Sequence, residues 1–235
     1  MSEADILILT AASIAFLHTV LGPDHYLVFT ALGKARGWKL AKTLRVTLLC
    51  GVGHVLGSVL LGGIGILLGA ELAKLVAIEG VRGNLAGYAL LAFGLVYMVW
   101  GIRKAVRSRA HSHVHRHGDL VHAHKHDHLG DHLHVHDEPA KTSITPWALF
   151  IVFVLGPCEA LIPLFMYPAA QSSMGLVFAV ALVVGTVTLL TMLLGVAVTF
   201  LGLERLRLQA PGHYAHAVAG ASIVLCGSAI SFLGL

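Results

Sequence analysis

Two short stretches of the chain combine a helix-breaking dipeptide with side chains that commonly bind metal ions. The first reads His18-Thr19-Val20-Leu21-Gly22-Pro23-Asp24-His25, and the second reads Leu155-Gly156-Pro157-Cys158-Glu159. Both lie within long apolar runs, where a Gly-Pro step interrupts the hydrogen bonding of a helix. In a membrane such an interruption is tolerated only where protein or a water-filled cavity satisfies the backbone. We therefore interpret the two stretches as broken helices that form the two halves of one binding site.

Imidazole nitrogens suit nickel, cobalt, copper and zinc, and a carboxylate adds charge neutralisation. An ionisable side chain inside a bilayer costs about 2.5–3.5 kcal/mol, so it is expected to have a function. The candidate metal ligands are His18, Asp24, His25, His54, Cys158 and Glu159. For Cys158, a small buried residue is an equally good interpretation. Glu159 could bind the metal or carry the proton of an exchange mechanism.

The composition is that of a membrane protein. Apolar residues make up 57% of the chain and charged residues 12%, and the mean hydropathy is +0.82. A soluble domain carries about 25% charged residues. The formal charge of +4 comes from loop lysines and arginines, which does not indicate a nucleic-acid-binding surface. The three cysteines fall in apolar runs, so they indicate no disulfide framework.

Apolar run lengths predict about six transmembrane helices. The expected spans are Ile6–Leu32 with a break at Gly22-Pro23, Thr43–Gly69, Leu85–Ile102, Trp147–Tyr167 with a break at Gly156-Pro157, Leu176–Leu201 and Val218–Leu235. The predicted class is therefore an all-α membrane protein.

The two halves of the chain also match each other in sequence. Leu21-Gly22-Pro23 matches Leu155-Gly156-Pro157 at an offset of 134 residues, and Gly87, Gly94 and Gly101 match Gly220, Gly227 and Gly234 at an offset of 133. A unit of three spans must invert in its second copy, which predicts two inverted three-helix repeats with broken first helices. The glycines taken alone could instead serve close helix packing. The expected divisions are a first repeat at 1–104, a linker at 105–145 and a second repeat at 146–235.

Lysine and arginine in the loops set the expected orientation. The first, third and fifth loops hold Lys34, Arg36, Lys39, Lys42, Arg45, Arg103, Lys104, Arg107, Arg109, Arg116, Lys125, Lys141, Arg205 and Arg207. The other side has Lys74 and Arg82. We expect an integral protein of a prokaryotic inner membrane, with cytoplasmic odd-numbered loops and both termini outside.

The linker carries a histidine-rich tract that we expect to bind soft or borderline divalent metals. Its members are His111, His113, His115, His117, His122, His124, His126, His128, His132, His134 and His136. A cytoplasmic tract of this kind is better suited to collecting or sensing metal than to conducting it.

These motifs resemble those of the nickel/cobalt transporter superfamily, which comprises the NiCoT and NicO families, RcnA-like exporters and UreH-like relatives. The resemblance rests on His18, Asp24-His25, Gly53-His54, the repeated Leu-Gly-Pro and the histidine-rich loop. It implies an inner-membrane transporter of Ni²⁺ or Co²⁺ in which the early histidines and the aspartate handle metal. The permease pattern has four residues between its first histidine and Asp-His, whereas five separate His18 from Asp24 here.

The expected function is transport of divalent transition-metal cations, by efflux or by metal–proton exchange, rather than catalysis. Ni²⁺ or Co²⁺ would be the transported ion, and no permanent cofactor is expected. The expected partners are the metal ion and the lipid bilayer, with a homo-oligomer left open and nucleic acid excluded. One alternative is a CcdA-like thiol transporter, although Asp24 stands where that class would place the partner of Cys158. The other is a metal-sensing accessory protein without a transport cycle.

Overall fold

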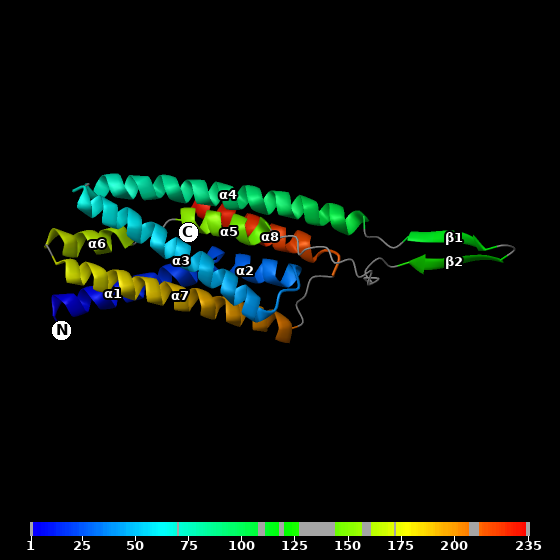
Figure 1. The fold of residues 1–235 in the computed structure, drawn as a ribbon, viewed down its shortest axis with the longest axis horizontal. Coiled ribbons are helices and arrows are strands. Elements are labelled where there is room, and N and C mark those ends of the chain that lie inside the picture. Colours follow the sequence, from blue (N-terminus) through cyan, green and yellow to red (C-terminus); the bar gives the residue numbers. More distant parts are fainter. Residues whose placement is uncertain are drawn as a thin grey trace.

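The computed structural model describes residues 2–69, 71–107, 111–117, 120–126, 144–156, 161–171, 173–206 and 212–233. These residues form eight α-helices, a π-helical turn η1 and one two-stranded hairpin (Figure 1). The elements are α1 (Glu3–Leu21), α2 (Asp24–Ala35), α3 (Leu40–Leu67), α4 (Leu72–Arg107), β1 (His111–His117), β2 (Leu120–His126), α5 (Ile144–Leu155), α6 (Leu161–Ala170), α7 (Met174–Arg205), α8 (Ala215–Ser228) and η1 (Ala229–Leu233).

The first helix begins and ends where its sequence dictates. The Ser2 hydroxyl accepts a hydrogen bond from the Asp5 amide, and the Asp5 carboxylate accepts one from the Ser2 amide, which together form a capping box. The last amide of the helical pattern is that of Gly22, which donates to the His18 carbonyl at 2.9 Å. Pro23 has no amide to continue the ladder, so the chain turns there and α2 begins at Asp24.

Five helices are long and apolar enough to cross a membrane: Glu3–Leu21, Leu40–Leu67, Leu72–Arg107, Met174–Arg205 and Ala215–Phe232. Their outward faces are apolar, with Leu60, Phe178 and Leu182 between 62% and 72% exposed. Polar side chains such as Thr47 and Ser58 are instead fully buried. This distribution fits a membrane protein.

The expected fourth span, Trp147–Tyr167, is not one continuous helix. It contains two short helices: α5 has 12 residues and α6 has 10. A helix of 12 residues rises about 18 Å, which is well short of the roughly 30 Å apolar core of a bilayer. The described chain is therefore all-helical in its apolar part, with five long helices and three shorter ones, α2, α5 and α6.

The longest helix starts earlier than the apolar pattern predicted. We expected the third span to begin at Leu85, with Arg82 in an outer loop, but α4 begins at Leu72. Arg82 lies inside this helix, and its Nη1 atom is 2.7 Å from Oε1 of Glu79. Because the two opposite charges lie three residues apart and pair with each other, the helix continues through them.

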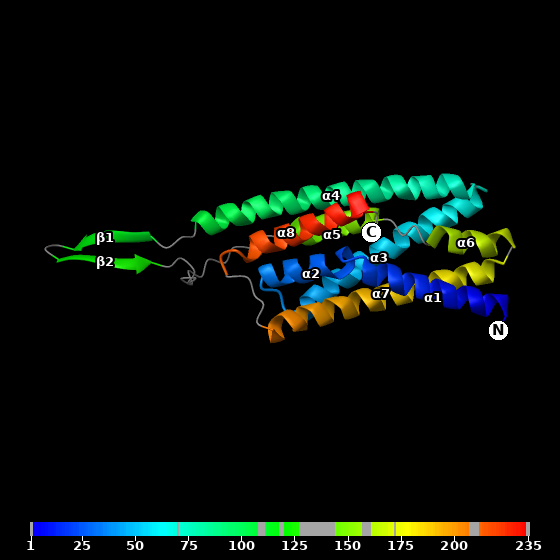
Figure 2. The same cartoon turned by 180° about the vertical axis from the view of Figure 1, so that it is seen from behind.

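Helices α4 and α8 run antiparallel and side by side, as both views of the molecule show (Figures 1 and 2). Their contact depends on glycine. A Cβ atom on Gly94 would lie 2.7 Å from the Val224 nitrogen, and one on Gly227 would lie 2.6 Å from the Leu91 nitrogen. The two backbones therefore touch directly, as small residues at helix interfaces allow.

The remaining helices pack across the two halves of the chain. Helix α1 lies along α7 and α5 lies along α3, while α2 packs on α7 and α8. One buried cluster, which includes Phe29, Leu90, Phe153 and Ile223, joins α2, α4, α5 and α8. Each half thus contributes helices to a common interior, which lies around the break between α1 and α2.

The strands β1 and β2 form an antiparallel hairpin within the histidine-rich tract, a feature that the sequence interpretation did not include. Its register sets histidine opposite histidine at three positions: His111 with His126, His113 with His124, and His115 with His122.

Glycine at the α4–α8 contact should be necessary for stability. Gly94→Ala is expected to destabilise the protein by about 1–3 kcal/mol, because the new methyl group meets backbone that cannot rotate away. The control is Gly80→Ala on the same helix, where a Cβ atom meets nothing within 4 Å. Thermal melts of the two purified variants check this prediction, and equal melting temperatures would contradict it.

Candidate metal centre

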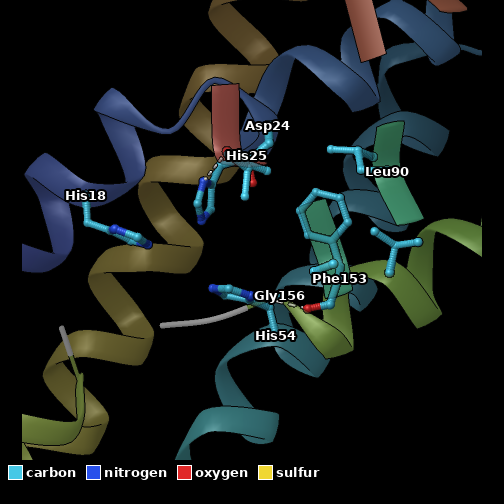
Figure 3. A pocket seen from close by; sticks show the side chains of 10 residues that line it. His18, Asp24, His25, His54, Leu90, Phe153 and Gly156 are labelled. Carbon is cyan, nitrogen blue, oxygen red and sulfur yellow. Dashed lines mark hydrogen bonds and ion pairs between the residues drawn. The ribbon is translucent and has the colours of Figure 1, made fainter. Parts of the chain in front are cut away.

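Three of the predicted ligands meet at the break between α1 and α2. His18, His25 and His54 each offer one ligand atom, and these atoms all lie within 4.8 Å of one another. The rings are oriented edge to face, with centroids 5.2 Å apart for His18 and His25 and 5.4 Å apart for His25 and His54. Figure 3 shows the three imidazoles pointing toward one another from separate helices. We call this group the histidine cluster.

The three histidines of the cluster lie on three different helices. His18 lies one turn before the end of α1, His25 is the second residue of α2, and His54 lies in the middle of α3. His25 and His54 are buried, with 4% and 2% of their surfaces exposed. The five-residue spacing between His18 and Asp24 therefore does not remove His18 from the group, because the chain turns at Gly22 and Pro23.

One nitrogen of each buried ring is already bonded to oxygen. Nδ1 of His25 lies 3.1 Å from the Gly22 carbonyl oxygen and 3.2 Å from Oδ1 of Asp24. Nδ1 of His54 lies 3.2 Å from the Phe153 carbonyl oxygen. Since these oxygens are acceptors, Nδ1 carries the proton in both rings and Nε2 keeps a free lone pair.

The Nε2 atoms of His18, His25 and His54 are all buried without a hydrogen-bond partner in the described part of the chain. A buried acceptor left unbonded costs about 1–3 kcal/mol. Three nitrogens bound at about 2.0–2.1 Å to one tetrahedral metal ion stand about 3.3 Å apart, so modest ring movements would close this group around a cation. These three Nε2 atoms are thus the atoms to which a metal ion would bind.

The cavity at the cluster is small, with a volume of about 40 Å³. Its walls include Leu90, Val152 and Phe153 in addition to the histidines. Pockets for drug-sized ligands span about 300–1,000 Å³, whereas one water needs only about 10–15 Å³. In this conformation the site therefore has room for an ion or a few waters.

Asp24 lies behind His25. Its carboxylate bonds the Nδ1 atom of His25, on the ring edge opposite the orphaned Nε2. A carboxylate in that position fixes the tautomer and orientation of an imidazole and raises its basicity as a ligand. Asp24 also adds negative charge beside a site made of neutral rings.

The two break glycines contact the imidazoles. A Cβ atom on Gly22 would lie 2.6 Å from Nδ1 of His25, and one on Gly156 would lie 3.0 Å from Nδ1 of His54. Each Gly-Pro step therefore does more than interrupt a helix, because its glycine lets a ring approach the backbone. Both glycines belong to the same small region of the molecule, as Gly156 also lines the cavity.

The other predicted residues are only partly described. Pro157, Cys158 and Glu159 lie outside the described residues, as do His128, His132, His134 and His136. Thr188, which matches His54 at the repeat offset, is 1% exposed, and its hydroxyl oxygen has no hydrogen-bond partner in the described part of the chain.

Sequence reasoning missed one buried polar group beside the site. Arg82 and Glu79 of α4 and Ser58 of α3 form a hydrogen-bonded network at the end of α5. The signal in the sequence is an acid and a base three residues apart in an apolar run, although the loop-charge pattern places the arginine in an outer loop.

Comparisons with family models, curated proteins and solved structures gave no match to this chain. What the chain can do is therefore inferred from its site geometry and its sequence motifs.

Removing one histidine of the cluster should weaken metal binding at the cluster. We expect His25→Ala and His54→Ala each to weaken Co²⁺ binding about a hundredfold or more, since loss of an outer-shell partner alone costs about 10–100-fold. The measurement is a Co²⁺ titration of the purified protein followed by visible absorption. His213→Ala is the matched control, because that histidine is exposed and lies outside the cluster. Unchanged affinity in both cluster variants would rule out this site.

Proposed function

We propose that the chain is a membrane transporter for divalent transition-metal cations, with Ni²⁺ or Co²⁺ as its transported ion. The observation that carries the proposal is the convergence of three orphaned imidazole nitrogens inside a bundle of apolar helices. Nitrogen ligands of this kind suit nickel and cobalt better than magnesium or calcium, which prefer oxygen. The motif resemblance to the nickel/cobalt transporter superfamily points to the same class of substrate.

The location of the cluster favours transport over storage. It lies at a helix break, where carbonyls freed from the ladder present the negative end of the α1 dipole. Broken helices of this kind form the ion sites of many secondary transporters, near the middle of the membrane. A stably bound structural metal would instead favour a closed site on unbroken elements.

Two inverted repeats are the arrangement that we propose for the bundle. In support, each half has one helix before its Gly-Pro step and three after it: α1 and then α2 to α4 in the first half, α5 and then α6 to α8 in the second. Helices α3 and α7 begin at Leu40 and Met174, 134 residues apart. The packing is also reciprocal: α1 lies on α7, while α5 lies on α3. Glycines of both halves face the partner backbone where α4 meets α8. A pseudo-two-fold axis between the halves accounts for all three relationships.

We further propose that the odd-numbered loops and the histidine-rich tract are cytoplasmic and that both termini lie outside. Arg82 is largely buried and paired with Glu79, whereas Lys74 is exposed in the first turn of α4. This strengthens the charge asymmetry between the two sides, because Lys74 is then the exposed basic residue of the opposite side. A metal-collecting tract on the cytoplasmic side fits efflux or metal–proton exchange.

A thiol-transport function is less well supported. Cys50 and Cys226 are buried free thiols, and they lie on different helices from the break residues. The groups that meet in the described site are imidazoles, which bind cations and do not exchange disulfides.

Cells that make the protein should differ in metal content from cells that make the His54→Ala variant. We expect altered accumulation of nickel or cobalt across a panel of nickel, cobalt, zinc, copper and manganese, because the variant lacks one nitrogen of the cluster. Uptake of radioactive nickel into vesicles containing the purified protein then separates transport from sensing. Identical accumulation of all five metals, together with inactive vesicles, would contradict the proposal.

Deleting residues 111–136 should leave a folded transporter with altered metal sensitivity. The strands of this tract pair with each other, so their removal takes no helix from the bundle. Membrane insertion and transport at saturating metal are expected to persist, while the response to low metal concentrations changes. Loss of all transport at saturating metal would show that the tract is part of the pathway.

A further inference from the structure

Arg82 is an arginine within an apolar helix, with 15% of its side chain exposed. Its Nη1 atom donates to Glu79 at 2.7 Å, and its Nη2 atom lies 3.1 Å from the Ser58 hydroxyl. A charge held inside a membrane bundle is costly and is expected to serve the ion pathway.

The other partners of this guanidinium are the last carbonyls of the short helix α5. Nη2 donates to the Gly156 oxygen at 2.8 Å and to the Val154 oxygen at 3.3 Å, and Nε donates to the Leu155 oxygen at 3.3 Å. These carbonyls form the negative end of the α5 dipole. At a half-helix end of this kind a transporter would otherwise hold a cation. Arg82 supplies a fixed positive charge there.

The same turn of backbone contacts His54. The Phe153 oxygen accepts from Nδ1 of His54 at 3.2 Å, and the Gly156 Cα lies close enough that an added Cβ atom would be 3.0 Å from that nitrogen. Residues 153–156 therefore lie between Arg82 on one side and His54 on the other. A shift of this turn would move the acceptor that sets the tautomer of His54, and with it the direction of Nε2.

The end of α1 is held differently. Besides the His25 amide, which donates to the Gly22 oxygen at 3.1 Å, its donors include two side chains: Nδ1 of His25 lies 3.1 Å from the Gly22 oxygen, and the Tyr26 hydroxyl lies 3.2 Å from the Val20 oxygen. Both are side chains that can donate without a net charge. The two breaks are thus alike in sequence but unlike in charge, since a guanidinium sits at one and neutral donors sit at the other.

We propose that Arg82 is a positioning residue of the metal site. It stands in for a cation at the end of α5, holds residues 153–156 in place, and thereby holds His54 in the tautomer and orientation that direct Nε2 into the cluster. The divalent ion is then left to the α1 side of the site. This inference rests on the proposed metal-binding function of the histidine cluster.

The test is a Co²⁺ titration of the purified full-length protein, read by visible absorption and reported per folded protein. The absorption component that disappears in His54→Ala defines the signal of the cluster, separate from metal bound by the histidine-rich tract. Arg82→Gln is expected to weaken this component about tenfold in affinity and to change its spectrum, since outer-shell partners are worth about 10–100-fold. Arg82→Lys should recover part of the affinity, because it keeps the charge but donates from a single point.

The matched control is Lys74→Gln. Lys74 and Glu71 are also three residues apart at the start of α4, but their side chains are 69% and 73% exposed. This variant should bind Co²⁺ as the wild type does. If Arg82→Gln fails to give a monodisperse protein, Arg82→Lys carries the test against the same control.

The possible results separate the two proposals. Loss of the signal in His54→Ala with wild-type affinity and spectrum in both Arg82 variants would overturn the positioning role and leave the metal site standing. A lower melting temperature in Arg82→Lys, with unchanged binding per folded protein, would also overturn it, because a purely structural residue gives that result. A wild-type signal in His54→Ala would instead overturn the proposed metal site itself.

Discussion

The structure depends on one constraint: backbone groups and ring nitrogens inside an apolar bundle must find partners within the protein. Lipid cannot satisfy them, and each buried group left unpaired costs free energy. A Gly-Pro step breaks the hydrogen-bond ladder of a helix and so creates carbonyls that need donors. At both breaks side chains donate in addition to backbone amides: His25 to Gly22, His54 to Phe153, and Arg82 to the three carbonyls that follow Phe153.

This constraint also explains why the imidazoles point as they do. A histidine whose Nδ1 proton is given to a backbone carbonyl must turn Nε2 the opposite way. In His25 and His54 the opposite way is toward the same cavity, where His18 arrives from the end of α1. The same hydrogen bonds therefore satisfy carbonyls at the two helix breaks and direct the Nε2 atoms of His25 and His54 into one cavity, which His18 also lines. Glycine at positions 22 and 156 is what lets the rings come close enough to do so.

Much of this arrangement could be predicted from sequence, and the failures have physical causes. The Gly-Pro steps and the buried histidines were visible, because ionisable residues within apolar runs are rare. The spacing of His18 did not indicate whether it joins the group, since the direction of a chain after a break depends on packing. The sequence places Arg82 in a loop because a charged pair, Glu79 and Arg82, is typical of an exposed segment. The carbonyls of α5 that bind Arg82 lie more than 70 residues away in the sequence, so no local pattern indicates them. The role of Asp24 behind His25 depends on a rotamer, which no spacing reveals.

Under the proposed transport function, the charges around the site suit an ion that enters and leaves. Arg82 and Glu79 form a pair with no net charge, and the three imidazoles are neutral ligands. Counting only the described residues, with Asp24 ionised, the empty site carries one negative charge and the site loaded with a divalent cation would carry one positive charge. The self-energy of a buried charge grows as its square, so these two states cost similar amounts in a low-dielectric interior. Without the carboxylate, the empty site would be neutral and the loaded site would carry two charges, so loading would raise the self-energy from zero to about four times that of a single charge. Under the proposed function, the Asp24 carboxylate therefore makes the electrostatic costs of the empty and loaded sites similar, in addition to orienting the His25 ring.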